Sequence, residues 1–237
     1  GACNSGSVMT QATGFAYEVV VVMDQKDWKG PAGEAIKSEL ASSVPGLPQA
    51  EPSLKITYVQ PKDFTGLLRY VRNILVVTID PTAYTKVSVG YENNVWARGQ
   101  VVVSLKAPNT ESIVEYSKTH EKALVNFFVK VEMNRAIEQL QKEYSMVVMD
   151  NLKSDLNVML NAPANFTYYK DTTDFFWSSN NANTGRMDLI VYTFPYTDPN
   201  TFTEEYLVAK RDSVLKANLP GSFPGSYMQT ETRAGVE

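Results

Sequence analysis

Apolar residues recur at three- and four-residue steps through the middle of the chain, from residue 109 to residue 161. This stretch has neither glycine nor proline, and its spacing is that of one face of a helix. A helix of this length gains most of its stability by packing such a stripe against other elements. The pattern therefore predicts a long central helix, with a bend at Ser145–Met149, where four apolar residues are consecutive. The stripe comprises Ile113, Tyr116, Leu124, Phe128, Val131, Ile137, Leu140, Tyr144, Val148, Leu152, Leu156 and Met159.

Segments on both sides of this helix have the patterns of strands. Phe15–Asp24 is rich in β-branched and aromatic residues and nearly all apolar toward its end, which is typical of a strand covered on both faces. Ile74–Ile79 is predicted to be another buried strand. Leu54–Val59 alternates between polar and apolar residues, as a half-buried strand does. The remaining predicted elements are a hairpin of 85–91 and 99–106, strands at 166–170 and 188–194, and helices at 31–44, 61–71 and 201–218.

These elements predict an α+β fold, with a mainly antiparallel sheet and helices packed on one face, led by the central helix. Residues 1–13 are expected to form a flexible tether and residues 14–237 a single domain. The pentads Ile36–Leu40 and Leu152–Leu156 are similar, and each precedes a proline-containing loop and two strands. One interpretation is an internal duplication, with related halves 14–107 and 108–237 sharing one sheet. The other is chance, because amphipathic helices often contain such pentads.

Composition and charge exclude several classes of protein. Hydrophobic residues make up 43% of the 237 residues and charged residues 20%, as in ordinary globular proteins. The net charge is −4 and no basic run exceeds two residues, which argues against nucleic acid as a partner. The longest apolar run, Val19–Met23, has the length of a strand and is far from the roughly 20 residues that span a bilayer.

The only cysteine, Cys3, is informative through its neighbours. Gly1-Ala2-Cys3 looks like the end of a lipobox, the motif at which the cysteine of a bacterial lipoprotein is acylated. The small polar residues that follow are those of a flexible tether. The sequence thus predicts a lipid anchor at Cys3 that holds the protein to a membrane. The alternative interpretation is a free thiol on a disordered terminus.

Motifs for catalysis, cofactors and metals are missing from the sequence. A single histidine, His120, and a single cysteine exclude a Cys/His zinc site and a Cys-His nucleophile pair within the domain. No phosphate-binding loop or dinucleotide fingerprint is present, so we expect no cofactor and no metal. Glu132, with Arg135 three residues on, lies between apolar positions. This pair is either a structural ion pair or a weak candidate for a perturbed acid.

Aromatic residues provide a candidate binding surface. Trp96 lies in the predicted hairpin loop next to Arg98, and Phe175, Phe176 and Trp177 are consecutive. Large aromatic residues dominate the energetics of interfaces, which favours contact with a ligand or partner. For Trp96, the alternative interpretation is that its ring folds back over the edge of a sheet.

Several segments together resemble one protein family, and the resemblance covers the chain from about Phe15 to Glu231. They are 46–52 (GLPQAEP), 72–75 (RNIL), 96–100 (WARGQ), 189–197 (LIVYTFPYT), 210–212 (KRD) and 225–231 (GSYMQTE). The family is that of Bacteroidetes cell-envelope lipoproteins classed as a domain of unknown function, DUF4837. The resemblance implies a lipid anchor and an envelope location, together with further chain beyond the Tyr227-Met228 segment. It implies no activity and no catalytic residue.

The sequence therefore predicts a lipid-anchored protein of the cell envelope, on the periplasmic face of a membrane, acting as a non-catalytic binding or scaffolding domain. Its partner would be an unknown envelope protein or glycan. The alternative is a carboxylate-dependent hydrolase that acts on an envelope glycan or peptide, which requires a pair of carboxylates in a cleft. A purely structural role in an envelope complex is a third hypothesis.

Overall fold

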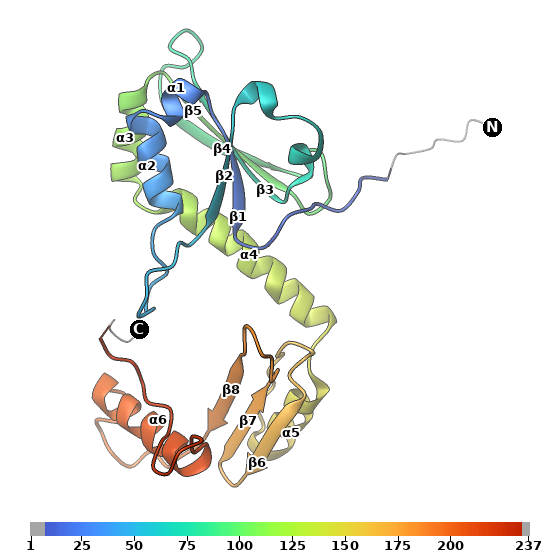
Figure 1. Ribbon diagram of the computed structural model, residues 1–237, viewed down its shortest axis with the longest axis vertical. Coiled ribbons are helices and arrows are strands. Elements are labelled where there is room, and N and C mark those ends of the chain that lie inside the picture. The colour runs from blue at the N-terminus through green and yellow to red at the C-terminus, as the bar shows by residue number, and fades with distance from the viewer. Residues whose placement is uncertain (1–7, 234–237) are drawn as a thin grey trace, which may run out of the picture. The chain divides into compact units, whose positions relative to one another are not determined.

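The computed structural model describes residues 8–233 and divides the chain into two units, Gly1–Met133 and Asn134–Glu237 (Figure 1). The boundary between the units falls inside helix α4 (Ala123–Lys142). The relationship predicted between halves 14–107 and 108–237 stays a prediction. Within the described residues, no helix is both long and apolar enough to cross a bilayer.

The first unit is built around a five-stranded sheet with the order β2-β1-β3-β5-β4. Four strands are parallel, namely β1 (Glu18–Val22), β2 (Lys55–Val59), β3 (Asn73–Ile79) and β5 (Val101–Ala107). Only the edge strand β4 (Ser88–Asn93) runs antiparallel, because it forms the predicted hairpin with β5.

The prediction of a mainly antiparallel sheet is wrong, since the main sheet is mostly parallel. Helices α1 (Gln25–Trp28) and α2 (Pro31–Leu40) connect β1 to β2 and return the chain to the end of the sheet at which β1 begins. Such crossovers are what make neighbouring strands parallel. The continuous apolar runs of β1 and β3 already indicated strands covered on both faces, which is typical of parallel sheets.

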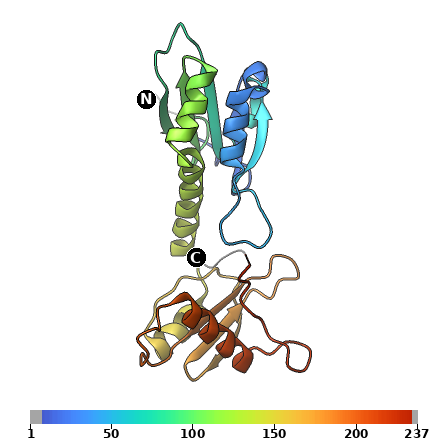
Figure 2. The same ribbon diagram turned by 90° about the vertical axis from the view of Figure 1, so that its left-hand side faces the viewer.

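Helices cover one face of this sheet, with α2 and α3 (Thr110–Thr119) side by side (Figures 1 and 2). The main hydrophobic core lies between them and the strands, and it includes the start of α4. Two 3-10 turns, Pro61–Asp63 and Gly66–Tyr70, stand where the sequence predicted one helix at 61–71, and residues near them pack on the opposite face. Fully buried side chains of the main core include Val21, Ile36, Leu75, Leu105, Ile113 and Phe128.

The predicted long helix is three helices: α3, α4 and α5 (Met146–Leu156). Asn109 caps α3 as expected, since its side chain accepts a hydrogen bond from the backbone N–H of Ser112. A left-handed Lys122 separates α3 from α4. The chain also breaks before α5, near the predicted bend, because Ser145 caps that helix through the N–H of Val148.

A distant carboxylate caps the start of α4. Oε1 of Glu39, from α2, accepts hydrogen bonds from the N–H groups of Leu124 (2.7 Å) and Val125 (3.4 Å). The first N–H groups of a helix have no partner within the helix, so this carboxylate satisfies two of them. Burial raises the pKa of Glu39, and the two backbone hydrogen bonds only partly oppose that effect.

The second unit has its own antiparallel sheet, formed in the order β6-β7-β8 by β6 (Tyr168–Thr172), β7 (Phe175–Ser179) and β8 (Asp188–Tyr192). Phe176 and Val191 point to the face on which α5 packs. The opposite face carries Lys170, whose Nζ donates to the carbonyl of Asn218 at the end of α6 (Glu204–Asn218).

Two expectations about the sheets are therefore wrong. Helices do not share one face throughout, because in the second unit α5 and α6 contact opposite faces of the small sheet. The proposed halves also do not share a sheet, since the strands form a five-stranded and a three-stranded sheet. The echoing strands differ in pairing as well: β2 and β3 both flank β1, whereas β6 and β7 are direct antiparallel neighbours.

Candidate functional site

The structure places Trp96 in the first unit as a half-buried residue beside the sheet. Its ring packs edge-on against Phe64, with ring centroids 5.6 Å apart, and contacts the apolar cluster on the face opposite the helices. Its backbone N–H donates to Gln100, whose side chain in turn donates to the carbonyl of Val71. These contacts favour the interpretation that Trp96 folds back over the sheet. Arg98 is exposed nearby, and its Nε donates to Gln11 (3.2 Å).

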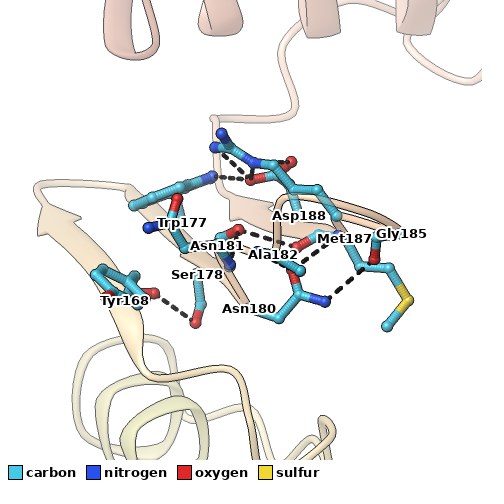
Figure 3. Close-up of polar contacts among 11 residues, drawn as sticks. Tyr168, Trp177, Ser178, Asn180, Asn181, Ala182, Gly185, Met187 and Asp188 are labelled. Atoms are coloured by element: carbon cyan, nitrogen blue, oxygen red, sulfur yellow. Dashed lines mark hydrogen bonds and ion pairs between the residues drawn. The ribbon is translucent and has the colours of Figure 1, made fainter.

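The aromatic triplet lies in the second unit, on strand β7. Phe175 and Phe176 are only 3% and 1% exposed, so their side chains belong to the core. Trp177 is half-buried, and its indole Nε1 donates to Oδ1 of Asp188 on the neighbouring strand (3.0 Å; Figure 3). Of the three aromatic residues, Trp177 presents the most surface to a ligand.

Asp188 fixes both Trp177 and the adjacent Arg186. The Arg186 guanidinium lies 3.1 Å from Oδ1 of Asp188, and its Nε is 3.2 Å from Oδ2. Burial by itself would raise the pKa of Asp188, but hydrogen bonds from Arg186 and Trp177 outweigh it and lower the pKa. Asn180 closes the same hairpin through its side-chain oxygen, which accepts from the N–H groups of Ala182 and Met187 (Figure 3). These contacts tie the indole to Asp188 and the two arms of the hairpin to each other.

Glu132 is buried in the first unit, at 3% exposure, and its carboxylate joins three elements. It accepts from Nε of Arg72 (3.2 Å), from the side-chain amide of Asn73 (3.4 Å) and from the N–H of Tyr17 (3.1 Å). This arrangement favours the structural interpretation of Glu132. Arg135 is half-buried farther along α4, and its predicted pairing with Glu132 stays a prediction. Cys3 lies outside the described residues.

A pocket of about 500 Å³ lies in the second unit between α5, β6 and β7. Three aspartates line it, Asp155 from α5, Asp171 from β6 and Asp174 from the turn after β6. Phe175 and Phe176, two residues of the predicted binding surface, also line it. The other lining residues are Asn151, Leu152, Ser154, Leu156, Thr172 and Thr173, and the lining contains no lysine, arginine or histidine.

Two of these carboxyl groups are in direct contact. A hydrogen bond to Asp155 raises the pKa of Asp171, and burial and the charge of Asp155 add to the effect. Like charges this close repel each other, so the pair favours a ligand that donates hydrogen bonds to its oxygens. Asp174 has a left-handed backbone (φ 59°), and its Oδ1 accepts from the hydroxyl of Thr193.

Sequence reasoning missed these aspartates as a site. In the sequence Asp155 is one residue of an amphipathic pentad, Asp171 lies at the end of a short strand and Asp174 in the turn after it. Acidic residues on either side of a turn are a weak signal, and nothing in the sequence shows that α5 lies against β6. Within residues 8–233, no group of three or more His, Cys, Asp or Glu side chains is placed to hold a metal ion.

Comparisons with known proteins divide the chain into two parts. A family model described as a domain of unknown function (DUF8532) matches residues 12–141, and a second, described as a domain of unknown function (DUF4837), matches residues 145–237. The resemblance to DUF4837 is thus confirmed for the second part, whereas the first part matches a separate model. The two matches meet at the break between α4 and α5. No curated protein and no solved structure matches the chain.

Proposed function

The chain belongs to the DUF8532 family, whose model matches more than half of it, and carries a DUF4837 match after it, and from this premise we propose a non-catalytic binding function. In this proposal the protein is lipid-anchored at Cys3 on the periplasmic face of an envelope membrane. Its ligand is an envelope glycan that binds in the acidic pocket of the second unit.

The observation that carries the proposal is the chemistry of the pocket lining. Asp155, Asp171 and Asp174 present oxygen acceptors, while threonine, serine and asparagine side chains add donors. Ionised carboxylates accept charge-assisted hydrogen bonds from hydroxyl and amino groups, which sugars present in number. With no cationic side chain in the lining, the pocket repels phosphates and uronic acids. Its volume is within the range of small-molecule sites, which is about 300–1,000 Å³.

A binding experiment with three trisaccharides tests the ligand class. Calorimetry would compare a neutral N-acetylglucosamine trisaccharide, its cationic deacetylated form and an anionic galacturonic acid trisaccharide. The neutral and cationic sugars are expected to bind and the anionic sugar to fail. Asp171→Asn should weaken binding about tenfold, as expected for a lost hydrogen bond to a charged group. Asp150→Asn is the matched control, because Asp150 is exposed on α5 outside the pocket. Equal binding of all three sugars would refute the proposal.

The lipid anchor rests on the sequence Gly1-Ala2-Cys3 and the small polar residues after it. Metabolic labelling of bacteria with an alkyne fatty acid should tag the protein, and Cys3→Ser should abolish the tag. Protease treatment of intact and permeabilised cells locates the domain. Digestion only after permeabilisation fits the periplasmic face, whereas digestion in intact cells places the domain on the outer surface.

The contact between Asp155 and Asp171 favours a second candidate function, that of a carboxylate-dependent hydrolase. Glycosidases hold their two carboxyl groups about 5–10 Å apart, whereas hydrogen-bonded carboxyls fit the shared-proton pair of aspartic proteases. Asp171 is exposed, so water screens the charges of the two carboxyl groups from each other, and we favour binding. Release of soluble fragments from purified cell-wall material, lost in Asp155→Asn and retained in Asp150→Asn, would establish the hydrolase instead.

A further inference from the structure

A second pocket lies in the first unit, on residues that the sequence analysis did not single out. Its volume is about 470 Å³. It is bounded by the residue before β1, by the loop from α2 to β2 and by the first turns of α4. The lining residues are Tyr17, Ser42, Ser43, Val44, Pro45, Glu51, Pro52, Ser53, Lys122, Val125, Asn126 and Val129.

Hydrogen bonds hold the loop side of this pocket in one conformation. The N–H of Ser53 donates to the carbonyl of Ser42 (2.8 Å), and the N–H of Val44 donates to the carbonyl of Glu51 (2.9 Å). The hydroxyl of Ser53 also donates to the carbonyl of Ser42 (2.6 Å). Because these bonds tie the two arms of the loop together, the pocket is formed before any ligand arrives.

Backbone strain marks the other side of the pocket. Six residues other than glycine have positive φ angles within the described part of the chain, and four of them are asparagine or aspartate, which tolerate that conformation. The other two are Tyr17 and Lys122, each with a φ of 61°, and both line this pocket. Strained residues of this kind persist where the surrounding structure holds them and cluster at functional sites. The N–H of Tyr17 is held by Glu132 (3.1 Å).

The pocket combines one positive and one negative side chain with apolar walls. Lys122 and Glu51 are exposed, and neither forms an ion pair with any residue between 8 and 233. Serine hydroxyls lie between apolar wall residues such as Val44, Pro45 and Val129. A ligand that matches this lining carries a carboxylate, an amine and a small apolar body.

We propose that this pocket binds a short peptide or amino acid with a free amine and a free carboxylate, the carboxylate pairing with Lys122 and the amine with Glu51. This site is separate from the acidic pocket of the second unit and shares no lining residue with it.

Calorimetry on the full chain tests the proposal with the dipeptides alanyl-alanine and valyl-valine. Each is compared with its N-acetylated and its C-amidated form. At least one free dipeptide should bind, and either block should weaken it about tenfold, because each removes a charge-assisted contact. Lys122→Gln should abolish the preference for a free carboxylate, and Glu51→Gln the preference for a free amine. Lys130→Gln, exposed on α4 outside the pocket, is the control. Equal affinity for blocked and free dipeptides, or no binding at about 10 mM, would overturn the proposal.

A glycine variant separates a binding role of Lys122 from a structural one. Lys122→Gly removes the side chain and relieves the strain, so the midpoint of thermal unfolding should rise by a few degrees. Binding of the dipeptide should nevertheless weaken to the level of Lys122→Gln. Retained binding in the folded glycine variant would show that the lysine side chain does not hold the ligand, which contradicts the proposal.

Discussion

Removing the carboxylate of Glu132 should strongly destabilise the first unit. The carboxylate joins α4 to the start of β3 through Arg72 and Asn73, and to the residue before β1 through the N–H of Tyr17. Glu132→Ala leaves a cation without this partner and two hydrogen-bond donors without this acceptor. Tyr17 also loses a contact that holds its left-handed backbone.

The size of the effect follows from burial. The Glu132 side chain is 1% exposed and that of Arg72 is 27% exposed, so water reaches the arginine only in part. Breaking a buried ion pair by removing one partner costs about 3–5 kcal/mol. Because Arg72 can rehydrate partly, we expect about 3 kcal/mol for Glu132→Ala. Glu132→Gln keeps an acceptor for Tyr17 and should cost about half as much.

Urea unfolding followed by tryptophan fluorescence measures this loss. Trp28 and Trp96 lie in the first unit and Trp177 in the second, so a Trp177→Phe background reports on the first unit alone. For a unit of this size, about 3 kcal/mol corresponds to a fall of roughly 10 °C in the thermal midpoint. Glu115→Ala, exposed on α3, is the control and should change stability by less than about 0.5 kcal/mol. A loss below about 1 kcal/mol for Glu132→Ala would refute the reasoning.

Three further predictions concern other contacts. Burial raises the folded-state pKa of Glu39 above its unfolded value of 4.5, so its favourable contribution is present below pH 4.5 and is lost as pH rises through the folded pKa. Glu39→Gln should remove this loss of stability with rising pH. Urea unfolding of the wild type and the variant at several pH values tests this, and the same pH dependence in both would show that the assignment is mistaken. Asp188 has a lowered pKa, so its contribution to stability is present above pH 3.8 and is lost as pH falls. Asp188→Asn should cost about 0.5–1 kcal/mol and shift the fluorescence emission of Trp177. An unchanged emission spectrum would count against the hydrogen bond between Trp177 and Asp188. Trp96→Ala should lower stability by about 2 kcal/mol, because the half-buried ring packs edge-on against Phe64 and the cluster around it. Urea unfolding measures this loss, and a variant as stable as the wild type would contradict a packing role.

Local signals in the sequence predict most elements, but they do not predict how the strands pair. The cap at Asn109 and the apolar run of β1 are readable because each depends on residues a few positions apart. Parallel pairing of β1 with β3 joins residues more than fifty positions apart. The direction of that pairing depends on where the intervening crossover returns the chain, which no periodicity encodes.

The same limit applies to the sites. The sequence suggests Arg135 as the partner of Glu132 because it is three residues away, whereas the structure brings Arg72 to the carboxylate from sixty residues earlier. Asp155 and Asp171 likewise meet only because α5 packs beside β6. Phe175 and Phe176 are apolar enough for either a core or a surface, and only the fold shows that they are buried.

The order of the main sheet has a consequence for how the newly made chain acquires its structure. Strand β1 is synthesised first but lies between β2 and β3, so its second neighbour is complete only when residue 79 has emerged. Synthesis proceeds at about 5–20 residues per second, so the valines of β1 remain without sheet partners for several seconds. Pairings between distant segments also form slowly. The nascent first unit therefore exposes the apolar segment of β1 until both of its neighbouring strands have been made.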